Sequence, residues 1–120
     1  MRRALGLWGP VVLWMGVIFG ASCQSDVGAL GRVPDWLTHG TAYLLLCVLL
    51  CRALAGGFGG RLAAGAAFAA VAFCTGYGVS DEYHQSFVPG RDASLGDVAK
   101  DCGGAALGAL LFRRHAGVSR

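Results

Sequence analysis

The stretch A-L-G-L-W-G-P-V-V-L-W-M-G-V-I-F-G-A-S-C, residues 4–23, carries no charged side chain. A helix of about 20 apolar residues is long enough to cross the hydrocarbon core of a bilayer. Further uncharged runs occupy residues 36–51, 62–80 and, more briefly, 102–112. Four such runs leave no room for a separate soluble domain. The sequence therefore predicts one all-α domain over residues 1–120, an integral membrane bundle of four transmembrane helices.

Composition and charge support a membrane class. Hydrophobic residues make up 55% of the chain and charged residues 14%, which is too apolar for an ordinary soluble domain of this size. Most of the basic residues behind the net charge of +3 lie on one predicted side of the membrane, so the charge is explained by the orientation of the protein in the bilayer. We therefore expect a lipid bilayer as partner and no nucleic acid. Seven basic residues lie on one predicted side of the membrane, either before the first run, between the second and third runs, or after the last run: Arg2, Arg3, Arg52, Arg61, Arg113, Arg114 and Arg120. By the positive-inside rule, we expect a multi-pass protein of the cytoplasmic membrane with both termini in the cytoplasm.

Local signals place the helix ends at about residues 4–23, 35–54, 61–87 and 95–112. Pro34 suits the first turn of a helix, and the glycine-rich segment 56–60 suits a helix end and a short turn. Pro89 and Gly90 stop the third helix. The first run also resembles a signal peptide ending near Cys23, but its length favours an uncleaved helix. The five cysteines show no C-x-x-C pair, and we interpret them as apolar packing residues.

Polar residues recur at helical spacing on three of the four expected helices. Residues three, four, seven and eight positions apart share one face of an α-helix. The stripes consist of Asp35, His39 and Tyr43; of Tyr77, Ser80, Asp81, His84 and Gln85; and of Asp97 and Asp101. The predicted topology puts all three at the outer side of the membrane. Charged groups at that depth cost roughly 2.5–3.5 kcal/mol each on insertion scales, so we expect them to converge on one outward-facing site.

Within this expected site, Asp81, Glu82 and His84 are the catalytic candidates. Carboxylates and imidazole bind divalent cations, and a histidine beside carboxylates is a general acid or base, so the same three residues are also the candidates for a divalent cation. Arg91 has the planar guanidinium that binds a phosphate or carboxylate. The ligand-binding candidates are His39, Gln85, Arg91 and Asp97. No motif of diagnostic spacing selects among these chemistries.

Several of these residues also fit a purely structural interpretation. Ser94 and Asp97 resemble a helix-starting cap, with the acid near the positive end of the helix dipole. Arg91 with Asp92 fits a solvated turn. Lys100 and Asp101 fit a pair that neutralises itself on entering the membrane. The cluster 81–85 is harder to explain as a solvated helix end and favours a functional site.

The polar residues also carry a family resemblance. The pattern Asp81-Glu82-x-x-Gln85-x-Phe87-x-Pro89-Gly90-Arg91, followed by Asp97 and a glycine-rich helix, resembles the signature of the VanZ-like family of small bacterial membrane proteins. Asp35-x-x-x-His39-x-x-x-Tyr43 resembles that family's other motif. The resemblance implies a link to the cell envelope and to lowered sensitivity to the glycopeptide antibiotic teicoplanin, without an established reaction or ligand. Trp36 stands where the family usually has lysine, and Asp101 where it usually has asparagine.

Three functional hypotheses follow. The first is an outward-facing site that binds an anionic envelope component such as a lipid-linked precursor. A catalytic version of this hypothesis adds chemical processing of that component. The second is a non-enzymatic scaffold or partner subunit, whose polar residues hold the helices together. The third is a small transporter, which would require oligomerisation for a pathway. Two small-residue faces, Gly16 with Gly20 on the first expected helix and Gly104 with Gly108 on the last, predict close helix approach, and we expect the last helix to pack inward on its glycine face. Such faces are also compatible with a homo-oligomer.

Overall fold

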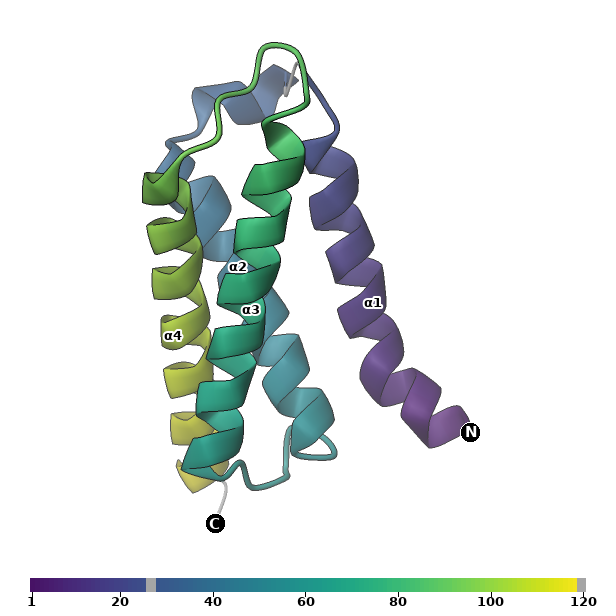
Figure 1. Ribbon diagram of the computed structural model, residues 1–120. Helices are drawn as coiled ribbons and strands as arrows, with labels where there is room; N and C mark the ends of the chain where they lie inside the picture. The colour runs from purple at the N-terminus through teal and green to yellow at the C-terminus, as the bar shows by residue number, and fades with distance from the viewer. Residues whose placement is uncertain (26–27, 119–120) are drawn as a thin grey trace.

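The computed structural model describes residues 1–25 and 28–118, and this part of the chain is helical (Figure 1). Its four α-helices are α1 (Arg2–Ser22), α2 (Asp35–Leu54), α3 (Ala64–Gln85) and α4 (Leu95–Val118). A short 3-10 helix, η1 (Gly28–Arg32), precedes α2. The expected all-α fold is confirmed.

The helix ends follow local chemistry, with two shifts from the expected bounds. The third helix occupies Ala64–Gln85 instead of 61–87, because turn-type bonds from Phe87 N to His84 O and from Val88 N to Gln85 O close it before Pro89. The fourth helix continues to Val118, well beyond residue 112. The basic residues of its last turns favour this extension, since positive charge stabilises the negative end of a helix dipole.

The most extensive helix contact joins α2 and α4, and two glycines make it possible. A Cβ on Gly104 would overlap the backbone of Gly40, and a Cβ on Gly108 would lie 2.5 Å from the Leu44 carbonyl oxygen. Only glycine permits such close approach of two helix backbones. The face of α4 that carries these glycines packs inward, as its spacing predicts.

The bundle core lies at this contact and continues onto α3. Its fully buried side chains include Leu46, Cys47 and Cys51 of α2, Cys74 of α3 and Ala105 of α4. These cysteines are free thiols that act as small packing residues, as expected.

Helix α1 packs against α2 and α3 through polar anchors. The Trp14 indole N–H donates to the Ala42 carbonyl (2.9 Å), and the Tyr77 hydroxyl donates to the Met15 carbonyl (2.7 Å). The expectation that Gly16 and Gly20 form a close-packing face is wrong. Both are exposed, and a Cβ at either would have no neighbour within 4 Å, because the side of α1 that meets the bundle is a different one.

Two of the described helices, α1 and α2, are long and apolar enough to cross a membrane, with mean hydropathies of 1.8 and 1.6. Only 11% and 33% of their apolar windows are buried inside the bundle. The remainder of each window is exposed and leaves an apolar surface that suits lipid. Helices α3 and α4 do not meet the same criterion. The sequence expectation of four spans is thus supported for two helices.

The two ends of the bundle differ in chemistry. The start of α1, the end of α4 and the connection between α2 and α3 lie at one end (Figure 1). Basic residues gather at that end, where the Arg52 guanidinium donates to the Gly6 carbonyl (3.1 Å). The predicted polar site lies at the opposite end, where the chain passes from α1 to α2 and from α3 to α4.

Candidate functional site

A cavity of about 400 Å³ opens at the polar end of the bundle. Its walls come from α1, α2, α3, the loop before α4 and the first turn of α4. The lining residues are Ile18, Ala21, Ser22, Gly31, Asp35, Thr38, His39, Ala42, Tyr43, Asp81, Gln85, Gly90, Arg91, Asp92 and Asp97. Five residues that the sequence selects are among them: His39, Asp81, Gln85, Arg91 and Asp97. Glu82 and His84 do not line it.

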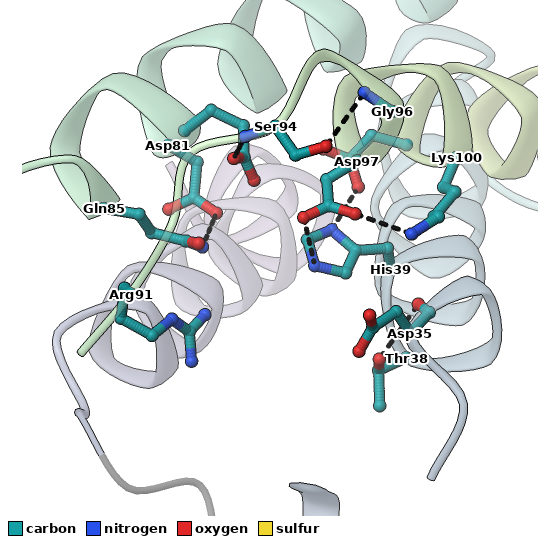
Figure 2. A network of polar contacts seen from close by, with 12 residues as sticks. Asp35, Thr38, His39, Asp81, Gln85, Arg91, Ser94, Gly96, Asp97 and Lys100 are labelled. Atoms are coloured by element: carbon teal, nitrogen blue, oxygen red, sulfur yellow. Dashed lines mark hydrogen bonds and ion pairs between the residues drawn. The ribbon is translucent and has the colours of Figure 1, made fainter.

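His39 lies between two carboxylates of α4 (Figure 2). Its Nδ1 is 2.9 Å from Asp101 Oδ1, and its Nε2 is 3.9 Å from Asp97 Oδ2. The two acids are four residues apart and so face the same way on α4. The imidazole therefore joins α2 to α4 at the cavity wall.

Lys100 neutralises Asp97 and not its neighbour Asp101. The ammonium Nζ lies 2.7 Å from Asp97 Oδ1, one helical turn away (Figure 2). Asp101 is fully buried, beside the α3 backbone at Gly78, where an added Cβ would lie 2.8 Å from Oδ2. The fully buried carboxylate thus depends on His39.

Glu82 holds the beginning of α4. Its Oε2 accepts a hydrogen bond from the Ser94 backbone N–H (2.8 Å), while the Ser94 hydroxyl accepts one from the Gly96 N–H (3.1 Å; Figure 2). The expected cap at Ser94 is present. The acid of this cap is Glu82 of α3 and not Asp97. The Asp97 carboxylate interacts with Lys100 and His39 instead.

Asp81 lies one turn from the end of α3 and is 6% exposed. The Gln85 amide donates to its Oδ2 over 3.3 Å (Figure 2). Four buried oxygens among the described residues lack a hydrogen-bond partner: Tyr43 Oη, Asp81 Oδ1, Glu82 Oε1 and Asp101 Oδ2. They belong to α2, α3 and α4 and come from the three predicted polar stripes or directly beside them. Such groups are costly to bury without a partner, which marks this region as a candidate ligand or ion site.

His84 lies away from the other acid–base candidates and faces α1. Its Nδ1 is 3.5 Å from Ser22 Oγ, its Nε2 is 3.8 Å from Cys23 Sγ, and its ring centroid is 4.6 Å from that of Phe19. The ligand atoms that converge within 4.8 Å of one another belong instead to His39, Glu82 and Asp101. The sequence analysis includes Asp101 in a polar stripe but not among the metal candidates, because the adjacent Lys100 offers it a partner.

Arg91 contributes a half-buried guanidinium to the cavity wall. Within the described residues, its side chain makes one long hydrogen bond, from Nη1 to the Gln24 carbonyl (3.5 Å). Figure 2 shows it on the Gln85 side of the site, apart from His39 and Lys100. Most of its donors thus have no partner in residues 1–25 and 28–118 and suit contact with a ligand.

The fold and site define an all-α membrane protein with a polar cavity at one end of its bundle. The family model VanZ/LLP1 matches residues 39–116, from the cavity histidine through nearly all of α4. The chain belongs to the VanZ/LLP1 family, as the resemblance in its motifs implies. Neither the curated proteins nor the solved structures give a match.

Proposed function

We propose that this protein binds the anionic headgroup of a lipid-linked envelope component in the cavity, with Arg91 as the contact to the anionic group. The observation that carries the proposal is the placement of the Arg91 guanidinium, which makes one long hydrogen bond to the described residues, in a polar cavity at the end of an apolar bundle. A lipid's tail would lie along the exposed apolar surface while its headgroup enters the cavity. Gln85 and His39 add hydrogen-bonding groups to the wall.

Arg91 suits this role for geometric reasons. A guanidinium presents several N–H donors in one plane and binds carboxylate or phosphate bidentately. Its 3.5 Å bond to the Gln24 carbonyl orients the side chain and engages one of its several donors.

The cavity's charge balance sets a condition on the ligand. Four carboxylates line it, those of Asp35, Asp81, Asp92 and Asp97. The basic residues that oppose them are Arg91 and His39 in the lining and Lys100, which is bonded to Asp97. A bare anion would be repelled by this excess of negative charge. The ligand therefore enters together with a cation, which offsets the acids.

Binding is better supported than catalysis. Of the three catalytic candidates, Glu82 caps α4 and His84 contacts α1, so neither reaches the cavity that Asp81 lines. We accordingly propose a binding protein whose capture of an envelope component alters teicoplanin susceptibility.

We further propose that all four helices cross the cytoplasmic membrane and that the cavity opens outward. The basic residues at the opposite end of the bundle support this orientation by the positive-inside rule.

The test is the affinity for a polyprenyl phosphate, measured for the full chain in nanodiscs of neutral lipid. Arg91→Gln should weaken binding about 10- to 100-fold, the range expected for the loss of a charge-assisted hydrogen bond. Arg32→Gln is the matched control, since Arg32 is exposed in η1 and does not line the cavity. Equal affinities for wild type and Arg91→Gln would contradict the proposal.

A scaffold function is the second candidate, and the interhelical polar bonds favour it. Trp14 and Tyr77 attach α1 to the bundle, and His39 joins α2 to α4. In a scaffold, polar substitutions lower the amount of folded protein without a separate effect on ligand binding. Membrane abundance measured beside polyprenyl phosphate binding distinguishes the two functions.

A further inference from the structure

The end of the bundle holds more buried negative charge than its protein partners neutralise. Asp81, Glu82 and Asp101 are each at most 6% exposed, and each has one carboxylate oxygen without a hydrogen-bond partner. Among the described residues, His39 is the basic side chain that bonds to one of these acids, since Lys100 is bonded to Asp97 and Arg91 to the Gln24 carbonyl. An unpaired buried carboxylate is among the most costly groups in a protein interior.

Three of these side chains converge. Ligand atoms of His39, Glu82 and Asp101 all lie within 4.8 Å of one another. They come from α2, α3 and α4 respectively, so one ion between them would join three helices. Two members of this group, Glu82 and Asp101, also each have a buried carboxylate oxygen without a hydrogen-bond partner among the described residues.

We propose that His39, Glu82 and Asp101 form a site for a divalent transition-metal ion of the Mn²⁺ or Zn²⁺ type. One imidazole and two carboxylates match the ligand preference of these ions, whereas Ca²⁺ and Mg²⁺ favour sites made of oxygen alone. Three protein ligands leave coordination positions open for water or for an oxygen of a ligand.

This cation site deepens the proposed function and rests on it for its role. His39 belongs both to the ion cluster and to the cavity lining. An ion held there would place positive charge at the cavity wall beside Asp97 and oppose the carboxylates that repel an anion. Arg91 and the ion would then contact the anionic headgroup from two sides.

The neighbouring packing fits a fixed ion site. Gly78 allows the Asp101 carboxylate to lie against α3, where a side chain would collide with it. The Glu82 bond to the Ser94 N–H comes from outside the cluster and holds one of the ligands in place. Groups held by such second contacts bind metal with defined geometry.

The experiment measures ion binding to the purified full chain, without a histidine tag, by calorimetry with Mn²⁺, Zn²⁺, Mg²⁺ and Ca²⁺ alone. We expect one ion per chain, with Mn²⁺ or Zn²⁺ bound more tightly than Mg²⁺ or Ca²⁺. Affinity should fall as the pH is lowered, because the ligands bind metal only when deprotonated.

Near-isosteric variants test the ligand set. Asp101→Asn, Glu82→Gln and His39→Gln should each weaken binding by at least the roughly 10- to 100-fold that loss of an outer-shell partner costs. His115→Gln is the matched control, because His115 lies near the other end of α4, outside the cluster and the cavity. No bound ion on wild type, or equal affinity in all variants, would overturn the site.

A second measurement separates this site from the proposed function. Polyprenyl phosphate binding by wild type is measured with and without Mn²⁺ or Zn²⁺, and we expect the ion to increase affinity. Ion binding without any phosphate binding would refute the proposed function and keep the cation site. Phosphate binding that is unchanged by the ion would keep the proposed function and overturn the cation's role in it.

Discussion

The packing of α4 on α2 positions Asp101 against His39, and Gly104→Ala tests it. The new Cβ would overlap the backbone of Gly40, which cannot move away as a flexible side chain could. Overpacking of this kind typically costs about 1–3 kcal/mol. Gly103→Ala is the matched control, because Gly103 is exposed and a Cβ there would have no neighbour within 4 Å.

The pair of variants isolates the packing cost. Both gain the same helix propensity from Gly to Ala, up to about 1 kcal/mol, so the difference between them contains the collision alone. We expect the free energy of unfolding of Gly104→Ala to be about 1–3 kcal/mol lower than that of Gly103→Ala. The assay is SDS titration in mixed micelles, followed by tryptophan fluorescence. Equal stabilities would refute the close α2–α4 contact.

Three further predictions concern the polar end. Glu82→Ala should lower the free energy of unfolding by about 1–3 kcal/mol, because the Ser94 N–H loses a charged acceptor. Hydrogen exchange at the start of α4 should rise, and unchanged exchange would contradict the cap. A membrane-impermeant maleimide should label exposed Cys23 in spheroplasts. It should not label Arg61→Cys in a Cys23→Ser background. The reverse pattern would show that the protein has the opposite orientation in the membrane. Expression of wild type in a sensitive host should reduce teicoplanin susceptibility, and Arg91→Ala should abolish the effect at equal membrane abundance; loss that follows abundance alone would favour a scaffold.

Much of the fold could be predicted because helix ends and helix faces are local properties. Pro34 and the glycines at 56–60 mark ends that depend on backbone geometry, and α2 begins at Asp35 and ends at Leu54 as expected. The small-residue face of α4 was readable from the spacing of Gly104 and Gly108. Gly16 and Gly20 have the same spacing on α1 but face away from the bundle. Spacing defines a face, and only the packing decides what that face meets.

The candidate site was predicted in outline, and its pairings were not. Asp81 and Glu82 are adjacent in sequence, yet the first lines the cavity while the second caps a helix across a loop. His84 and His39 both sit on polar stripes, and the rotation of each helix brings only His39 to the acids of α4. These outcomes depend on helix rotation and loop path, which hydrophobic periodicity does not determine.

The most direct test of headgroup binding in this cavity is photo-cross-linking. A polyprenyl phosphate with a diazirine beside its phosphate is incubated with the wild-type chain in nanodiscs, and the labelled residues are mapped by mass spectrometry. Binding in the cavity predicts labels within residues 38–43 and 81–92, which contribute most of its walls, and fewer labels with Arg91→Gln. Labels spread over the exposed face of α1 or gathered at the basic end near Arg113, unaffected by Arg91→Gln, would contradict it.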